Sequence, residues 1–217
     1  ALDPTKLKEQ LGTETKVEII LGDLSEDVIQ TIDLVVMSPG VPTDLPIVNQ
    51  MRDAGIPIWG EIELAYTYGK GDVLAITGTN GKTTTTALLG QIMKNYKDSV
   101  YVVGNIGNPY TTVSLDMKDD SIAVAEVSSF QLETIHEFCP RVSAILNITP
   151  DHLNRHHTME CYIETKEKIA MNQTKDDVCV LNYDDEVTRK FGENCNASVL
   201  YLSLIHISEP TRRYAIS

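Results

Sequence analysis

The sequence predicts an α/β fold built on a parallel β-sheet, and three observations support this prediction. Short apolar segments rich in β-branched residues alternate with segments of helical periodicity along most of the chain. The apolar segments are hydrophobic at nearly every position, as strands covered on both faces are. One of them runs directly into a glycine-bearing loop and then a helix. With 217 residues, 42% of them hydrophobic, the chain can form one or two packed domains.

The expected strands are short, and most are apolar throughout. In chain order they are Val17–Leu21, Leu34–Met37, Val73–Thr77, Val100–Val103, Ile122–Val127, Val142–Ile148 and Val178–Leu181. The expected helices lie between and after these strands. They are Leu45–Ala54, Glu61–Tyr68, Thr83–Asn95, Phe130–Phe138, Met159–Asn172 and Asp185–Phe191. Two glycines in Tyr68-Gly69-Lys70-Gly71 interrupt the pattern and predict a domain boundary near residue 69.

The charge balance restricts the partners that the protein can have. Lys and Arg number 18 against 31 Asp and Glu, a formal net charge of −13. Such a chain repels nucleic-acid backbones, so we expect no nucleic-acid partner, and binding of nucleotide phosphates requires a local positive device. No apolar run approaches the ~20 residues of a membrane span and no signal-peptide pattern is present, so a cytoplasmic protein is expected. Widely spaced cysteines indicate reduced thiols rather than a zinc ribbon.

A phosphate-binding loop is predicted where the strand Val73–Thr77 meets the helix after it. Glycines there let backbone N–H groups close around a phosphate, and the helix N-terminus adds partial positive charge. Lys82 supplies a charge for the terminal phosphates, and the Thr83 hydroxyl can bind Mg²⁺. The expected phosphate-binding residues are Gly78, Thr79, Asn80, Gly81, Lys82, Thr83 and Thr84. Ile76 stands where a standard P-loop has glycine, and the alternative is an ordinary strand–turn–helix joint with a solvated lysine.

Acidic and histidine residues come after two other expected strands. Glu126 ends one strand and would face the phosphates at the carboxyl edge of a parallel sheet, where an acid can hold Mg²⁺; a solvated acid is the alternative. Asp151 or His152 would reach the same crevice from the next strand along the chain. His152 is one of three histidines within residues 152–157, but the arginine among them and the lack of a suitably spaced cysteine argue against zinc. A structural role for His152 is the alternative.

Lys166 lies on the apolar stripe of the expected helix Met159–Asn172. Its neighbours one turn away along that helix are Tyr162, Ile163, Ile169 and Ala170. A lysine in such a stripe snorkels to solvent, pairs with an acid or loses its proton. A neutral amine can react with CO₂ to form a carbamate, which acts as a long carboxylate and can bind a metal. A snorkelling helix lysine is the alternative.

Taken together, these motifs resemble those of the Mur ligases, ATP-dependent enzymes that form amide bonds in peptidoglycan synthesis. Thr77-Gly-Thr-Asn-Gly-Lys-Thr83 is similar to the family's own version of the phosphate loop, including the departure at Ile76. Other segments, within a resemblance that covers about Leu2 to Leu200, are similar to the members that add D-glutamate to UDP-N-acetylmuramoyl-L-alanine. They are Ser38-Pro-Gly40, Gly104-Asn-Ile-Gly107, Glu126-Val-Ser-Ser-Phe-Gln-Leu-Glu133, Leu146-Asn-Ile-Thr-Pro-Asp-His152 and Tyr162-Ile-Glu-Thr-Lys166.

The resemblance implies a role for each candidate residue. The loop amides would hold the ATP phosphates, and Lys82, Lys166 and His152 would serve catalysis. Two Mg²⁺ ions are implied: Thr83 and Glu126 would hold one, and His152 with carbamylated Lys166 the other. The implied substrate-binding residues are Ser38, Pro39, Gly40, Asn105 and His152. The γ-phosphoryl of ATP would pass to the alanyl carboxylate, and the amine of D-glutamate would then displace phosphate.

The resemblance also implies a monomeric, three-domain enzyme of which this chain holds a part. Residues 1–69 would belong to an N-terminal, Rossmann-like domain that binds the UDP-substrate, and residues 70–201 to a central P-loop-type domain that binds ATP, with the C-terminal domain absent. Residues 202–217 have no counterpart in the family pattern and read like a translated sequencing adapter. A non-native tail is therefore expected there, with a lineage-specific strand as the alternative.

Three other functions stay open on the sequence. The nearest is another Mur ligase, adding L-alanine or a diamino acid, although Ser128-Ser-Phe-Gln-Leu132 argues against it. An enzyme like folylpolyglutamate synthase would share the architecture. The chain by itself could instead be a non-catalytic module that binds ATP with Mg²⁺ and makes no product.

Overall fold

The structure, a computed structural model, describes residues 17–204 and divides the chain into two compact units. The first unit comprises Ala1–Val35 and Thr43–Pro57, and the second comprises Val36–Pro42 and Ile58–Ser217. The expected boundary at residue 69 stays a prediction. The tail expected from residue 202 falls largely on residues 205–217, which lie outside the described residues.

Among the described residues, the first unit contains the helices α2 (Glu26–Ile29) and α3 (Pro46–Asp53). Helix α2 begins at Ser25, whose hydroxyl accepts a hydrogen bond from the Val28 amide, and α3 begins with a proline, which suits a first helical position. The strand expected at Val17–Leu21 is wrong, because these residues have no regular structure. A β-branched segment becomes a strand only where a neighbouring strand pairs with its backbone, and among the described residues none pairs with it.

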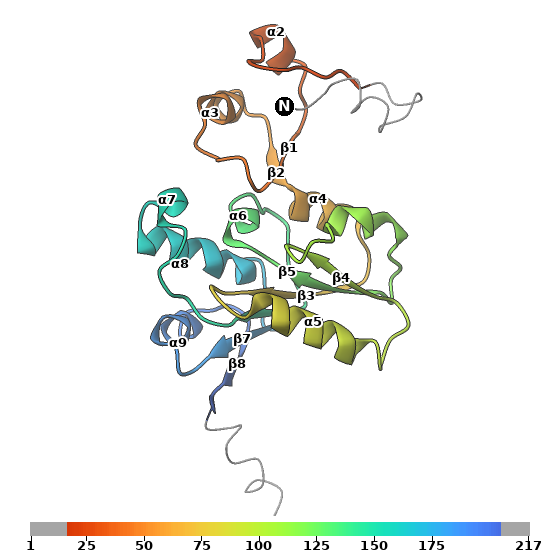
Figure 1. The fold of residues 1–217 in the computed structure, drawn as a ribbon, viewed down its shortest axis with the longest axis vertical. Helices are drawn as coiled ribbons and strands as arrows, with labels where there is room; N and C mark the ends of the chain where they lie inside the picture. The colour runs from red at the N-terminus through yellow and green to blue at the C-terminus, as the bar shows by residue number, and fades with distance from the viewer. Residues whose placement is uncertain (1–16, 205–217) are drawn as a thin grey trace, which may run out of the picture. The chain divides into compact units, whose positions relative to one another are not determined.

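A six-stranded sheet forms the centre of the second unit, and all its pairings are parallel (Figure 1). Its strands, in spatial order, are β4 (Val100–Gly104), β5 (Ile122–Glu126), β3 (Asp72–Thr77), β6 (Val142–Ile145), β7 (Val178–Asn182) and β8 (Ser198–Leu202). The predicted parallel α/β fold is therefore confirmed. Two strands were missed: β8, and β2 (Ile58–Gly60), which pairs with β1 (Val35–Met37) in a small separate sheet.

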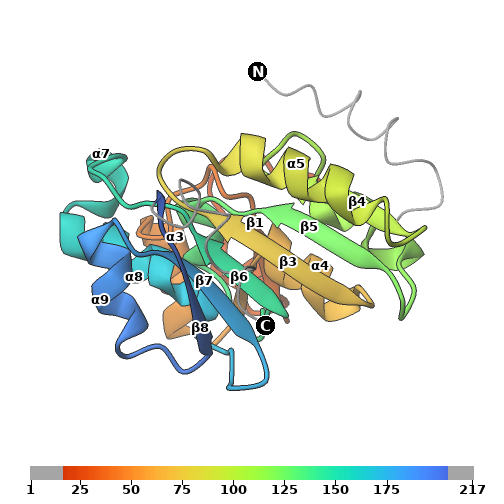
Figure 2. The same ribbon diagram turned by 90° about the horizontal axis from the view of Figure 1, so that it is seen from below.

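Helices cover both faces of the large sheet (Figure 2). Helix α5 (Lys82–Met93) covers one face, where Ile76 and Val124 pack beneath its Leu89 and Met93. On the other face lie α4 (Glu61–Tyr68), α8 (Met159–Glu167) and α9 (Glu186–Gly192), which complete the larger apolar core. The remaining short helices of the unit are α6 (Ser129–Leu132), α7 (Leu153–His156), η1 (Tyr110–Thr112), η2 (Ser114–Asp116) and η3 (Lys168–Ala170). No described helix is long and apolar enough to cross a membrane.

A buried carboxylate explains why α6 is shorter than expected. The Glu63 side chain on α4 is completely buried and accepts hydrogen bonds from three consecutive backbone amides, those of His136, Glu137 and Phe138, at 2.8, 2.6 and 3.1 Å. Those N–H groups would otherwise continue the helix predicted over Phe130–Phe138. Because they turn towards Glu63, the helix ends at Leu132.

Glu63→Gln tests how much this carboxylate contributes to the free energy of unfolding. The amide replaces one acceptor oxygen with a donor that faces backbone N–H groups, and it removes the charge that strengthens the other bonds. We expect the free energy of unfolding to fall by about 3 kcal/mol, measured by urea denaturation. The exposed neighbour Glu137→Gln is the matched control, and equal midpoints for the two variants would contradict the assignment.

Candidate functional site

The predicted phosphate loop lies between β3 and α5 and depends on two glycines. Gly78 and Gly81 have φ angles of +146° and +84°, which L side chains rarely adopt. A Cβ atom on Gly78 would also lie 3.1 Å from the Cβ of Leu146. No side chain caps the N-terminus of α5 at Gly81. The first amides of this helix have no intrahelical acceptor, so they are available to an anion.

Asn147 clamps this loop from the segment after β6. Its side-chain Oδ1 accepts from the Asn80 amide at 2.9 Å, and its Nδ2 donates to the Asn80 carbonyl at 3.0 Å. Its own carbonyl accepts from the Thr79 amide at 2.9 Å. The sequence analysis did not select Asn147 as a site residue, although a polar residue directly after a buried parallel strand is the signal that could have found it.

The segment carrying Asn147 is itself held by the next strand and helix. Asn182, at the end of β7, donates to the Leu146 carbonyl at 3.0 Å. Asp185 accepts from the Ile148 amide at 3.1 Å while its other oxygen caps the start of α9. The strand predicted over Val142–Ile148 therefore ends early, at Ile145, because the next residues turn to meet these side chains.

The Thr79 hydroxyl joins the loop to the same segment and to α8. It donates to the Thr149 carbonyl at 3.1 Å, accepts from the Thr149 amide at 3.0 Å and lies 3.2 Å from the Tyr162 hydroxyl. Thr79 was predicted as a phosphate-loop residue, whereas Tyr162 was named in an apolar stripe and in the segment Tyr162-Ile-Glu-Thr-Lys166 but was given no role at the site. Its phenol ring is buried and its hydroxyl reaches the loop, a combination that tyrosine alone among apolar-stripe residues provides.

Two lysines converge on one carbonyl oxygen of the loop. Lys82 donates to the carbonyls of Gly78 and Thr79 at 3.0 and 2.9 Å. Lys166 reaches the Gly78 carbonyl from α8 at 2.8 Å, and its Nζ lies 4.8 Å from the centre of the Tyr162 ring. Lys166 is only 1% exposed, so its amine does not snorkel to solvent.

This environment changes the ionisation of Lys166. Burial, followed by repulsion from Lys82, lowers the pKa of Lys166 to about 7, although Asp151 acts in the opposite direction. Near neutral pH a substantial fraction of the amine is therefore uncharged. Of the three states predicted for a lysine in this stripe, snorkelling disagrees with the burial of Lys166, and the lowered pKa makes loss of the proton accessible.

Glu126 and Asn105 meet at the ends of β5 and β4. The Asn105 side chain donates to Glu126 Oε1 at 2.8 Å, and the second oxygen, Oε2, is buried with no hydrogen-bond partner. A buried carboxylate oxygen without a donor suits a cation. Between residues 17 and 204 no group of three or more His, Cys, Asp or Glu residues could hold a metal ion by itself.

Two of the three histidines within residues 152–157, His152 and His156, have different surroundings. His152 has a left-handed backbone with φ of +51°, and its ring packs on Phe130 with 5.0 Å between ring centres. One carboxylate oxygen of Asp151 accepts a hydrogen bond from the His152 backbone amide at 2.8 Å. The other carboxylate oxygen lies 3.4 Å from Nε2 of the His152 ring. His156 is buried and bonded to the Ser129 hydroxyl at 3.0 Å, which gives it a structural role; burial lowers its pKa.

The remaining predicted substrate residues, Ser38, Pro39 and Gly40, form a turn directly after β1. The Val41 amide closes this turn by donating to the Ser38 carbonyl at 3.0 Å. Thr83 and Thr84 lie exposed in the first turn of α5, beside Lys82.

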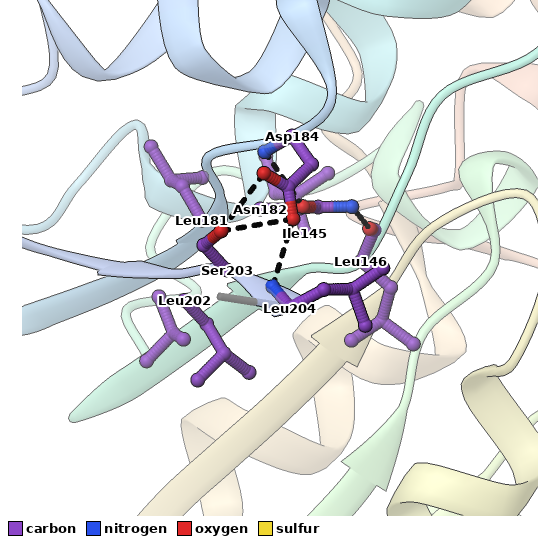
Figure 3. A pocket seen from close by; sticks show the side chains of 9 residues that line it. Ile145, Leu146, Leu181, Asn182, Asp184, Leu202, Ser203 and Leu204 are labelled. Atoms are coloured by element: carbon purple, nitrogen blue, oxygen red, sulfur yellow. Dashed lines mark hydrogen bonds between the residues drawn. The ribbon is translucent and has the colours of Figure 1, made fainter. Parts of the chain in front are cut away.

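A separate cavity of about 270 Å³ opens at the carboxyl ends of β6, β7 and β8 (Figure 3). Its walls are mainly apolar and include Leu146, the residue that packs against Gly78. Asp184 forms its polar edge, accepting from the Ser203 hydroxyl at 2.8 Å and the Leu204 amide at 2.8 Å. Ser203 and Leu204 belong to the segment expected as a non-native tail, so no function is assigned to this cavity.

Comparison with known proteins agrees with the motif analysis. A family model for the Mur ligase middle domain matches residues 76–210, and one for the N-terminal domain of MurD-like Mur ligases matches residues 3–60. The UDP-N-acetylmuramoylalanine–D-glutamate ligase of Lachnospira eligens is 61% identical, over 93% of this chain and 45% of the relative. The ligase of the same name from Clostridioides difficile is 53% identical, with the same coverage of 93% and 45%. The chain thus spans about half the length of the curated relatives it matches.

Solved structures share the fold at lower sequence identity. The MurF ligase from Thermotoga maritima, in complex with ADP, has a TM-score of 0.54 and 20% identity, covering 81% of this chain and 49% of that one. A UDP-N-acetylmuramate:L-alanyl-γ-D-glutamyl-meso-diaminopimelate ligase from Neisseria meningitides has a TM-score of 0.55 and 14% identity, covering 78% and 58%. At these identities the likeness shows the fold alone.

The lowered pKa of Lys166 predicts a pH dependence of stability. Between about pH 7 and 10.5 the unfolded chain binds a proton at this lysine that the folded chain does not, so the free energy of unfolding rises with pH. The slope from this group reaches about 1.4 kcal/mol per pH unit within that window. Below pH 7 both states carry the proton, and the cost of the buried charge is then at its largest.

Lys166→Met should therefore stabilise the chain relative to the wild type most at pH 6, with the difference shrinking towards pH 10. Urea denaturation at pH 6, 7, 8, 9 and 10 measures it. Lys168→Met, two residues further along the chain and only partly buried, is the matched control and should keep the wild-type slope. Equal slopes for the wild type and Lys166→Met would show that Lys166 is charged throughout this range in the folded chain.

Proposed function

The chain belongs to the Mur ligase family, and we propose that the full-length protein is an ATP-dependent ligase that joins D-glutamate to UDP-N-acetylmuramoyl-L-alanine. Its curated relatives at up to 61% identity carry the name of that ligase. Because the chain spans 45% of their length, activity, substrates and partners are proposed for the whole protein. For the chain by itself we propose binding of ATP phosphates.

The observation that carries this proposal is the meeting of Lys82 and Lys166 at the Gly78 carbonyl. The Lys82 Nζ contacts neutral carbonyls there, and a triphosphate would supply the negative charge that these acceptors lack. Lys82 is partly exposed, so its Nζ can leave the loop carbonyls and contact the β- and γ-phosphate oxygens. The amides at the start of α5 would hold the remaining oxygens, since no side chain caps them.

We propose the metal ligands from the donor atoms available at this edge. Thr83 and Glu126 would hold one Mg²⁺, and the unpartnered Glu126 Oε2 supports this choice. His152 and a carbamylated Lys166 would hold a second. When bound, Mg²⁺ would offset the negative charge that gathers on the phosphoryl group.

A carbamate on Lys166 is supported by its environment. The uncharged amine is the form that attacks CO₂, forming the N–C bond and releasing one proton, and a pKa of about 7 makes this form accessible near neutral pH. The product would bring negative charge next to Lys82, whose repulsion of the protonated amine it would replace by attraction.

The proposed reaction has two steps, phosphoryl transfer to the alanyl carboxylate and displacement of phosphate by D-glutamate. An oxygen of the alanyl carboxylate attacks the γ-phosphorus, the bond to the β-phosphate oxygen breaks, and ADP leaves. The amine nitrogen of D-glutamate then attacks the carbonyl carbon of the acyl phosphate, phosphate leaves, and the amine loses a proton. In both steps Lys82 and the loop amides would stabilise charge on phosphoryl oxygens, and Asn105 would contact the UDP-sugar substrate.

Amide formation by the full-length enzyme tests the proposal. With ATP, Mg²⁺ and UDP-N-acetylmuramoyl-L-alanine, we expect product with D-glutamate and none with L-alanine, L-lysine or meso-diaminopimelate. Lys82→Ala should lower kcat/KM at least about 100-fold, because it removes the mobile charge on the transferred phosphoryl group. Product with a different amino acid would identify a sister enzyme. ATP binding without product would leave a nucleotide-binding module.

Lys166→Ala separates the carbamate from a simple lysine. If the carbamate holds a metal, a short carboxylic acid diffusing into the vacated space should restore part of the activity of Lys166→Ala. The same acids should leave Lys82→Ala inactive, which makes that variant the control. An amine that rescues Lys166→Ala while carboxylic acids do not would show that the charged lysine, rather than its carbamate, is the working group.

A further inference from the structure

Arg155 on α7 is the feature of the second unit that the proposed chemistry leaves unexplained. Its side chain is 13% exposed, unusually low for an arginine, and it makes directed contacts on three sides. In the sequence, this arginine only argued against a zinc site formed by the histidines within residues 152–157. A guanidinium costs free energy to bury unless its donors are satisfied, so its partners indicate what it is for.

The Glu133 carboxylate fixes the plane of this guanidinium. Arg155 Nε donates to Glu133 Oε1 at 3.1 Å, and one terminal nitrogen donates to Oε2 at 2.7 Å. This two-point pair orients the group as well as binding it. The Phe130 ring lies 4.9 Å from the central guanidinium carbon and packs on one face of it. Both partners come from α6 and its C-terminal end.

The same terminal nitrogen also donates to the Val41 carbonyl at 2.9 Å. Val41 closes the Ser38–Val41 turn, and the turn lies in residues 36–42, which group with the sheet-containing second unit. The family model for the N-terminal domain nevertheless includes these residues, since it matches residues 3–60. Within the second unit, the Arg155 side chain thus links this turn to the C-terminal end of α6.

We propose that Arg155 is a positioning residue that holds the Ser38–Val41 turn in place for the uridine nucleotide part of the substrate, with Glu133 setting its orientation. The substrate part of this inference rests on the proposed function. Glu133 orients the Arg155 guanidinium. The guanidinium in turn restrains the backbone of the turn through its hydrogen bond to the Val41 carbonyl. Arg155 touches no reacting atom.

The Phe130 ring extends this link to the catalytic side. Phe130 packs between Arg155 and the ring of His152, at 5.0 Å from the latter. One aromatic side chain therefore contacts both the residue that holds the turn and a residue proposed to contact substrate and metal. The acceptor carboxylate and the nucleotide are parts of one substrate molecule, so a fixed spacing between these two contacts favours a productive pose.

Hydrogen exchange on the 217-residue chain tests the structural half of this inference without any substrate. The Val41 amide is hydrogen-bonded within the turn, so its exchange reports on opening of that turn. In Arg155→Ala we expect peptides covering residues 36–45 to exchange at least about 10-fold faster, with β3 and β5 unchanged. Arg141→Ala is the matched control, because Arg141 also pairs with a carboxylate, Asp177 at 3.1 Å, but is largely exposed.

Steady-state kinetics of the full-length enzyme test the substrate half. Arg155→Ala should raise the KM for UDP-N-acetylmuramoyl-L-alanine about 10- to 100-fold and leave the KM for ATP within about 2-fold. Glu133→Gln should give a smaller rise in the same constant, because the fork loses its charged partner but keeps an acceptor. Arg155→Lys should fall between the wild type and Arg155→Ala, since an ammonium reaches one partner but cannot make the two-point pair.

The outcomes separate the inference from the proposed function. Unchanged exchange at residues 36–45 in both Arg155→Ala and Arg155→Lys would overturn the inference whatever the enzyme does. Equal rises in the KM for ATP and for the UDP-substrate would also overturn it, since they would mean a general loss of structure. If the wild-type full-length enzyme makes no product with any amino acid, the proposed function and the substrate half of the inference fail together, and exchange data alone cannot restore them.

Discussion

The parallel pairing of β3 with β5 on one side and β6 on the other is the constraint on which the candidate site depends. The register sets Ile76 opposite Glu126 and Thr77 opposite Ile145. All three strands therefore end at one edge, which brings together the predicted phosphate loop, the Glu126 carboxylate and the segment carrying Asn147. Because β5 is buried at every position, a shift of one residue would place apolar side chains in the wrong layer, so packing fixes the site geometry.

Once the loop is at this edge, it is held almost entirely by backbone and neutral side chains. Asn147 binds the peptide groups of the loop, and the loop's own Thr79 hydroxyl binds those of Thr149. The hydrogen bonds of the two lysines go to loop carbonyls. The framework is thus rigid without using up its positive charge. An anion that enters would meet backbone amides already in place and the nearby Lys82 charge, and such preorganisation is the condition under which electrostatic stabilisation of a transition state is large.

The sequence predicted the layout of this region better than its contacts, for a physical reason. Strand, loop and helix order around Lys82 follows from local periodicity and glycine placement, and these survive in the structure. The contacts that were not predicted join residues 20 or more positions apart. They are the bonds of Asn147 to the loop, the bonds of Glu63 to the segment after α6, and the pair of Arg155 with Glu133. Such contacts depend on which strands become neighbours, and single-sequence periodicity does not determine that. Lys166 was predicted in part. The apolar stripe on its helix predicted that its side chain is buried, whereas its acceptor, the Gly78 carbonyl, could be identified only from the folded structure.

The chain has a formal net charge of −13, and three of its buried or partly buried carboxylates differ in how they are partnered. Glu63 accepts hydrogen bonds from three backbone amides, and Glu133 is paired with the Arg155 guanidinium. Glu126 stands apart because one of its oxygens has no donor. Two of these carboxylates hold backbone segments in place, directly or through an arginine, and the third is left to a cation. Burial with satisfied partners therefore distinguishes the structural acids of this fold from the one proposed to bind metal.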